Sequence, residues 1–203
     1  MNKFTYLFAL AIFFSQTHLN AAHAPNYAQA VSVHCDPELN SCLEKIFKVE
    51  EARALISQVK REGSVRVITN KHQLSDQFGA YWDMERRVIC VNCQSTEGKW
   101  IGSILFELCN AAANSKLVHL DDLASRGQID REGYVSSVER IEFENSHIAA
   151  KIANSGIAQG IFPEDAFLPT YDTFEEHYKY QKIGGHSAWI EKNYYNLVPQ
   201  HRY

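Results

Sequence analysis

The segment Arg87–Asn114 (RVICVNCQSTEGKWIGSILFELCNAAAN) decides the fold. It begins with β-branched and apolar residues over 87–92, a run that is typical of a β-strand. A short polar loop follows, and from Trp100 to Ala113 the apolar residues recur at helical spacing. The segment therefore predicts a strand, a loop and a helix that packs against the sheet to which the strand belongs.

The residues before this segment predict one helix and further strands. The helix is expected to begin at Ser41, because Glu44 three residues later can form a capping box with it and an apolar stripe follows. Residues 64–70 (SVRVITN) are rich in β-branched side chains and predict a strand. Residues 78–82 and 87–92, separated by a polar turn, predict a β-hairpin.

The residues after the segment predict helices almost to the end of the chain. A long helix is expected to begin near Asp130, a good N-cap residue, and to end at Gly156. A short helix over 120–125 precedes it. Thr173 and Glu176 predict a capping box that opens another short helix, and a last helix follows. The expected fold class is α+β, with a small, mostly antiparallel sheet packed against several helices.

Composition and charge exclude several classes of protein. The chain has 203 residues, with 20 Lys+Arg against 24 Asp+Glu and a net charge of -4. Its apolar fraction of 45% excludes an intrinsically disordered chain. The mild acidity argues against a nucleic-acid partner, and the sequence has no Gly-rich phosphate loop. We therefore expect no nucleic-acid partner and no cofactor.

Residues 1–24 have the pattern of a secretory signal peptide. A single lysine precedes an apolar run over 4–14, and a polar stretch then ends in small residues at 22–24. The apolar run has about 11 residues, whereas a helix needs roughly 20 to cross a bilayer. We expect an exported bacterial protein, secreted or periplasmic, without stable membrane insertion after cleavage. Residues 25–40 would then form a flexible segment and 41–203 a single α+β domain.

An exported protein can form disulfides, and this chain has five cysteines. Cys35 and Cys42 bracket a short loop, so we expect them to form a bridge. The pairing of Cys90, Cys93 and Cys109 stays open. A metal site at the Cys90-x-x-Cys93 pair is less favoured than a structural disulfide, because the sequence has no second C-x-x-C. A redox site is less favoured because the pair follows a strand instead of opening a helix.

The predicted central helix carries the sequence Phe106-Glu107-Leu108-Cys109-Asn110-Ala111. This stretch resembles the His-Glu-Leu-x-His-Ala motif of zincin metallopeptidases. In zincins an edge strand precedes the active-site helix, and a second helix brings a further zinc ligand, which is a Glu in the gluzincin branch. The order of elements over residues 78–155 is similar, so the resemblance implies a zincin-like α+β fold.

The resemblance also shows what the motif has lost. Phe106 and Asn110 occupy the two zinc-ligand positions, and phenylalanine has no lone pair to offer. A neutral carboxamide is a poor zinc ligand compared with imidazole. Only Glu107, at the position of the general base, is kept. The resemblance implies a zincin fold without bound metal, in which Glu107 and Asn110 line a vestigial cleft with Glu142, or alternatively Glu139, from the long helix.

The expected role is therefore binding of an unknown protein or peptide partner, without the zincin reaction. One alternative is a metal-independent hydrolase that uses Glu107 as general base and Asn110 to orient the substrate; it requires Glu107 to be accessible in a pocket beside another polar group. A pseudo-enzyme allows Glu107 to be covered by Phe106 or tied into a hydrogen-bonded pair. A third class is a disulfide-bearing adaptor, which predicts an exposed apolar patch on the aromatic C-terminal tail.

Two further arrangements of reactive residues are less favoured. Cys109 and His147 could form a nucleophile pair if the fold brings them together. Glu107 with Glu139 or Glu142 could form a carboxylate pair of the glycosidase kind, but the sequence does not fix the separation of these groups.

Overall fold

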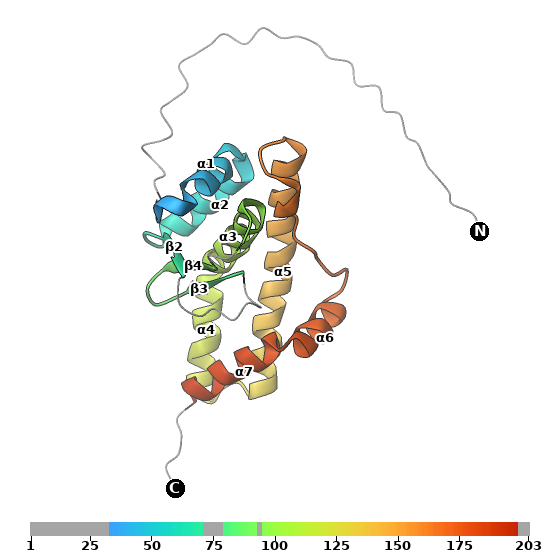
Figure 1. Cartoon of the computed structure of the whole chain (residues 1–203). Coiled ribbons are helices and arrows are strands. Elements are labelled where there is room, and N and C mark those ends of the chain that lie inside the picture. Colours follow the sequence, from blue (N-terminus) through green and yellow to red (C-terminus); the bar gives the residue numbers. More distant parts are fainter. Residues whose placement is uncertain (1–32, 71–78, 93–94, 199–203) are drawn as a thin grey trace, which may run out of the picture. The chain divides into compact units, whose positions relative to one another are not determined.

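The computed structural model describes residues 33–70, 79–92 and 95–198 (Figure 1). The predicted leader, residues 1–24, lies outside the described residues, as do residues 25–32 of the predicted flexible segment; its other residues, 33–40, contain β1 and a 3-10 helix. The described strands are β1 (His34–Cys35), β2 (Arg66–Asn70), β3 (Ala80–Asp83) and β4 (Val88–Asn92). The described α-helices are α1 (Asn40–Lys48), α2 (Glu50–Arg61), α3 (Glu97–Ala112), α4 (Asn114–Ser125), α5 (Arg131–Ala158), α6 (Phe174–Gly184) and α7 (His186–Leu197). None of the helices in these ranges has the length and apolarity to span a bilayer.

The four strands form one mixed sheet in the order β1-β2-β4-β3. The pairs β1–β2 and β2–β4 are parallel, and only β3 runs antiparallel to β4, with Trp82 opposite Ile89. The α+β class and the β3–β4 hairpin are thus confirmed, but the prediction of a mostly antiparallel sheet is wrong. Parallel pairing needs a crossover connection, which α1 and α2 supply between β1 and β2. Strand β1 is too short to show a pattern in the sequence.

The single helix predicted from Ser41 is two helices in the structure. Val49 separates α1 from α2 with an extended backbone (φ -89°, ψ 125°), and its side chain is fully buried. The predicted capping box does not form, because Ser41 lies inside α1 and its hydroxyl donates to Glu97 Oε1 at 2.7 Å. Ser41 therefore ties α1 to the first turn of α3.

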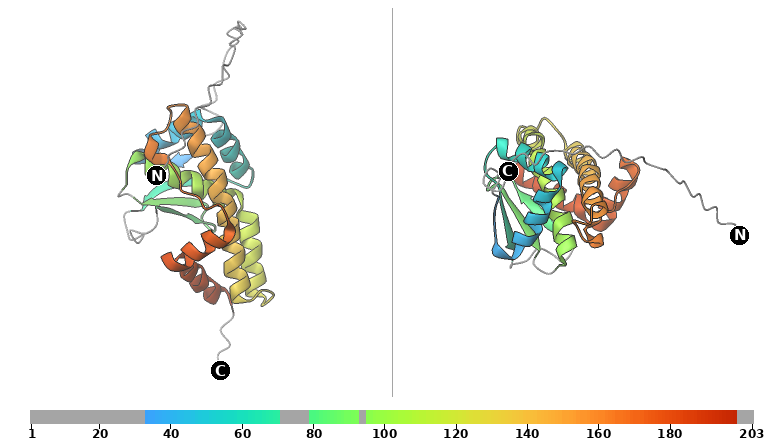
Figure 2. Two further views of the ribbon diagram at one scale, coloured as in Figure 1. Left: turned by 90° about the vertical axis from the view of Figure 1, so that its right-hand side faces the viewer. Right: turned by 90° about the horizontal axis from the view of Figure 1, so that it is seen from above.

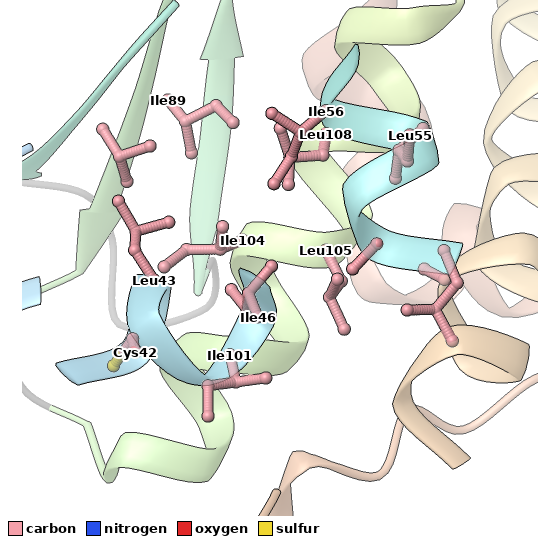
Figure 3. Close-up of a cluster of buried hydrophobic side chains, with 14 of the residues drawn as sticks. Cys42, Leu43, Ile46, Leu55, Ile56, Ile89, Ile101, Ile104, Leu105 and Leu108 are labelled. Atoms are coloured by element: carbon pink, nitrogen blue, oxygen red, sulfur yellow. The ribbon is translucent and has the colours of Figure 1, made fainter. Parts of the chain in front are cut away.

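Helix α3 is the centre of the apolar core. Its buried side chains meet those of α1, α2 and β4 (Figure 3), and the labelled members from α3 are Ile101, Ile104, Leu105 and Leu108. Thr96 caps the helix by accepting a hydrogen bond from the Lys99 backbone N–H. Each such apolar side chain contributes about 1.5–3 kcal/mol when fully buried. The predicted helix is confirmed, and its burial fixes the direction in which residues 106–110 point.

Helix α5 packs along α3 over much of its length (Figure 2). The Asp130 side chain accepts a hydrogen bond from the Gly133 backbone N–H at 2.8 Å, so the predicted start of the helix is confirmed. Gly156 is not the predicted cap, since the helix continues to Ala158. A Cβ at Gly156 would collide with the ring of Phe162. The glycine therefore makes room for Phe162 instead of ending the helix.

The predicted start of the helix α6 is confirmed at Thr173. Thr173 accepts a hydrogen bond from the Glu176 backbone N–H at 3.2 Å and opens α6. Gly185 follows α6 with a left-handed backbone (φ +85°), a conformation that favours glycine. Because the chain turns at Gly185, α7 begins at once with His186 and packs against α5 and α4 (Figure 1).

The predicted bridge between Cys35 and Cys42 does not form in the structure, where both are free thiols. Each sulfur has another partner: Cys35 Sγ donates to Asn40 Oδ1 at 2.9 Å, and Cys42 Sγ contacts the Glu97 backbone oxygen at 3.9 Å. Burial raises the pKa of Cys42 to about 11. The reason is local: the residues between the two cysteines fold into a 3-10 helix and the first turn of α1 instead of a loose loop.

Candidate functional site

A cavity of about 680 Å³ lies between strand β3 and helices α3, α4, α5 and α7. Aromatic side chains form much of its wall, namely Tyr81, Trp82, Phe106, Tyr134 and Trp189. Its polar lining includes Glu107, Asn110, Glu142 and His186 at one end. Three of the four predicted site residues therefore line one cavity, and the fourth, Glu139, lies fully buried behind its wall.

Glu107 on α3 is held in place by two hydrogen bonds. Its Oε2 accepts from Asn110 Nδ2 at 3.0 Å, and the Trp82 backbone N–H also bonds to the carboxyl group. The side chain lines the cavity, although the residue is only 6% exposed. Burial raises the pKa of Glu107 to about 8, because the hydrogen bonds to Asn110 and Trp82 offset only part of the desolvation. At neutral pH this carboxyl group is therefore mainly protonated.

Asn110, at the second ligand position of the motif, uses its amide within the protein. Its Oδ1 accepts a hydrogen bond from Asn145 Nδ2 at 2.9 Å, while its Nδ2 donates to Glu107. The bonds from Asn145 through Asn110 to Glu107 link α5 to α3. At the first ligand position, Phe106 is half-buried and packs against the apolar core. The motif positions thus form a wall of the cavity and offer no imidazole to a metal.

Glu139 on α5 is an anion surrounded by donors. Its Oε1 accepts from the Ser187 hydroxyl at 2.6 Å and lies 3.2 Å from His186 Nδ1, and its Oε2 lies 3.2 Å from His177 Nε2. Burial alone would raise the pKa of Glu139, but the contacts with His177, His186 and Ser187 outweigh it and hold the pKa at about 2. Glu139 therefore anchors α6 and α7 to α5.

Glu142 lies one turn further along α5 and faces the cavity. Its Oε2 is 3.4 Å from His186 Nε2, and its side chain is 13% exposed. Burial raises the pKa of Glu142 to about 7, and His186 counters part of this rise. Desolvation would lower the pKa of His186, but the bond to Glu139 and the charge of Glu142 raise it to about 9. His186 is thus an imidazolium between two carboxyl groups.

The sequence did not point to His186. It is one of nine histidines and carries no motif beyond the preceding glycine pair. The Gly184-Gly185 pair is the feature of the sequence that could have indicated His186. A glycine turn ends one helix and allows the next helix to begin at the following residue and fold back on its neighbours. The contact partner is 47 residues away in Glu139.

The other end of the cavity has a second polar group. The Tyr134 hydroxyl donates to Asp121 Oδ1 at 2.6 Å and accepts from Asn193 Nδ2 at 2.9 Å. All three residues line the cavity. Burial raises the pKa of Asp121, so the carboxyl groups at both ends of the cavity are desolvated.

The structure does not bring the predicted Cys109 and His147 into one site. Cys109 is 2% exposed, and burial raises the pKa of its thiol to about 12. His147 is exposed, and its Nε2 lies 3.0 Å from the Tyr171 backbone oxygen. Cys109 is therefore an inert core residue, since a nucleophilic thiol needs a lowered pKa.

The aromatic C-terminal tail divides between packing and exposure. Tyr194 packs on Tyr134 with ring centroids 5.6 Å apart, next to the buried side chain of Ile190. Ile183 and Trp189 are 73% and 54% exposed. The exposed side chains that an adaptor could use are thus a few on α6 and α7, and one of them, Trp189, also lines the cavity.

The chain was compared with protein-family models, with curated proteins and with solved structures, and none of them matches it. Function therefore has to be inferred from the geometry and chemistry of the cavity.

Proposed function

We propose that this protein is an exported binding protein whose zincin-like domain has lost its zinc ligands, and that the cavity beside β3 receives an extended peptide segment of its partner. The observation that carries this proposal is the state of Glu107. The one motif residue that is kept bonds to the Trp82 backbone and to Asn110, so it joins α3 to the edge of the sheet. A pseudo-enzyme allows that use of the residue, whereas a general base has to be available to a substrate.

The edge of the sheet supports binding of an extended segment. No other described strand pairs with the outer side of β3. The Asn92 backbone N–H donates to the Gly79 carbonyl at 2.8 Å, and in an antiparallel pair the facing positions alternate. The backbone groups of Ala80 and Trp82 therefore point away from β4; the Trp82 N–H is already bonded to Glu107, which leaves the N–H and carbonyl of Ala80 and the carbonyl of Trp82 for a peptide strand. A peptide strand can pair with such an edge and place alternate side chains in the neighbouring cavity.

The walls of the cavity suit apolar peptide side chains. Trp82 and Phe106 belong to β3 and α3, and Trp189 on α7 lines the cavity while remaining half exposed. Aromatic residues give a large contact area at a low entropy cost, which is why they carry much of the binding energy at interfaces. We infer that a hydrophobic side chain of the partner enters between β3 and α7.

A second candidate is the metal-independent hydrolase. One observation favours it: Glu107 and Glu142 line the same cavity and influence each other's charge. Two carboxyl groups of raised pKa can exchange protons with a substrate near neutral pH. In that case Glu107, being mainly protonated, would act as the acid and not as the base that the motif suggests.

The test of the binding proposal uses a library of short extended peptides and the purified protein. We expect selected peptides to bind to the wild type, and Ala80→Pro to weaken binding by about tenfold, because proline removes one outward N–H. The matched variant Ala80→Val keeps this N–H and should bind like the wild type. Thermal unfolding of both variants checks that the sheet is intact. Equal binding by Ala80→Pro would contradict pairing at this edge.

The same peptides separate the two candidates. A binding protein leaves the peptide intact, and Glu107→Gln keeps its affinity, because glutamine can still accept the Trp82 hydrogen bond. A hydrolase cleaves the peptide, and Glu107→Gln abolishes the cleavage. Mass spectrometry of the peptide after long incubation decides between these outcomes.

A further inference from the structure

The imidazole of His186 has a carboxylate at each of its nitrogen atoms. Nδ1 lies 3.2 Å from Glu139 Oε1, and Nε2 lies 3.4 Å from Glu142 Oε2. Glu139 is fully buried and is fixed by the Ser187 hydroxyl and by His177. The orientation of the His186 ring is therefore set from the Nδ1 side, and Nε2 is presented to the cavity beside Glu142.

This geometry is that of a metal-binding histidine with its supporting carboxylate. Two ligands of a tetrahedral zinc ion, at bond lengths of about 2.0–2.2 Å, lie roughly 3.4 Å apart. The Nε2–Oε2 distance of 3.4 Å matches this spacing. Metal-binding histidines almost always donate their other ring N–H to a carboxylate or carbonyl, and Glu139 occupies that place.

The site also has room for an ion and the means to hold it. Glu142 and His186 both line the cavity of about 680 Å³, which leaves space for the waters of an open coordination sphere. They come from α5 and α7, two helices that pack on each other, so their separation is fixed by the fold. Glu107 lines the same cavity and interacts electrostatically with both groups. One imidazole with carboxylates is a donor set that suits zinc and neighbouring divalent ions.

We propose that His186 Nε2 and Glu142 bind one divalent ion of the zinc class, with Glu139 orienting His186 through Nδ1 and cavity waters completing the coordination. The site is distinct from the motif, because Phe106 and Asn110 take no part in it. The ion takes the place of the proton on Nε2, and that proton is released to solvent while Nδ1 keeps its own. This proposal does not depend on the binding of a peptide at β3.

The experiment titrates the chelator-treated purified protein with Zn²⁺, and in parallel with Co²⁺, which reports its ligands in the visible spectrum. We expect one ion per chain and the release of a proton on binding. Glu142→Gln should weaken binding by about 100-fold or more, which exceeds the loss usually caused by removing a supporting residue. Glu144→Gln is the matched control, because Glu144 lies two residues away on α5 with its side chain 57% exposed.

Histidine variants complete the test. His186→Gln should abolish stoichiometric binding, and His119→Gln, at an exposed position on α4, should leave it unchanged. His186→Gln removes a partner of the buried Glu139, so its folding is checked by circular dichroism. Glu142→Gln leaves the contacts of Glu139 in place. If His186→Gln does not fold, the ion affinity of Glu142→Gln therefore tests the site.

Three results would overturn the proposal. The first is the absence of one-to-one binding of either ion by the wild type, and the second is unchanged affinity of Glu142→Gln. The third is a thiolate charge-transfer band in the Co²⁺ spectrum, which would assign the ion to cysteines. Ala80→Pro should bind the ion like the wild type, so failure of the peptide proposal can be told apart from failure of this one.

Discussion

Two buried acidic residues beside the cavity, Glu107 on α3 and Glu139 on α5, have opposite charge states. On α3, Glu107 sits within a motif, yet burial raises the pKa of its carboxyl group to about 8, so the group is held largely neutral. On α5, Glu139 belongs to no motif, and its partners from α6 and α7 hold its pKa at about 2. A carboxylate that is buried with donors stays charged, and one buried with few donors takes up a proton. The groups that surround a buried carboxyl group, more than its place in a motif, therefore set its protonation state.

The largest expected effect comes from the loss of Glu139. Glu139→Ala removes the common acceptor of His177, His186 and Ser187, so it should lower the free energy of unfolding by about 3–5 kcal/mol. Urea denaturation at neutral pH measures this loss. A loss below about 1 kcal/mol would mean that α6 and α7 are held mainly by their apolar contacts, and the contrast between Glu139 and Glu107 would then disappear.

The pH dependence of stability should have opposite signs for Glu139 and Glu107. The pKa of Glu139 falls from the ordinary 4.5 to about 2 on folding, so its contribution is full above pH 4.5 and is lost as the pH falls toward 2. The pKa of Glu107 rises from 4.5 to about 8, so stability declines as the pH rises across that interval. Glu142, whose pKa rises from 4.5 to about 7, adds to this decline in the same interval, and His186, whose pKa rises from 6.5 to about 9, extends it to higher pH.

Denaturation curves from about pH 3 to about pH 9 test these signs, and each limb is expected to span a few kcal/mol. Glu107→Gln should flatten part of the decline on the alkaline side and leave the acid side unchanged. Glu139→Gln should flatten the acid side and should also remove the part of the decline above neutral pH that His186 contributes through its bond to Glu139. The same response of both variants on both sides would contradict the separate roles of the two carboxyl groups.

A smaller effect is expected from the amide pair that joins α3 and α5. Asn145→Ala leaves Asn110 Oδ1 buried without the amide donor of Asn145, which should cost about 1–3 kcal/mol. Asn193→Ala is a suitable comparison, because it also removes one amide donor in the cavity but from a less buried position. Thermal or urea unfolding should rank Asn145→Ala as the more harmful of the two.

The smallest effect should come from Glu107→Gln at neutral pH. The carboxyl group is then mainly protonated, so a neutral amide of similar shape can replace it at a cost of about 1 kcal/mol or less. The direct comparison is Glu139→Gln, which removes a charge from three donors and should cost more. A large loss for Glu107→Gln in the unfolding assay would show that Glu107 is ionised in the folded protein.

Much of the secondary structure could be predicted because its signals are local. The caps at Asp130 and Thr173 are set by side chains that reach a backbone N–H three residues away. The β3–β4 hairpin depends on two short apolar runs and the turn between them. At Val49 the local pattern gives a wrong prediction, because the apolar side chain continues the helical spacing while the backbone is extended and separates α1 from α2.

Helix geometry alone could predict the candidate site only on its α3 side. Glu107 and Asn110 stand one helical turn apart, so the sequence places them on one face, and the structure joins them by a hydrogen bond. Glu142 was expected at the cavity from the resemblance, and it lines it. His186 and Ser187 were missed, because no spacing rule connects them to residues 47 and 48 positions earlier.

The α+β class, the starts of α5 and α6, the hairpin and the lack of imidazole ligands in the motif follow from the sequence alone. Only the tertiary structure decided the parallel pairing of β2 with β4, the free thiols of Cys35 and Cys42, and the meeting of Glu139 and Glu142 with His186. The reason is the range of the interactions. Caps and periodic patterns act within one or two turns, whereas sheet order and the site on α5 and α7 depend on how distant segments share one core.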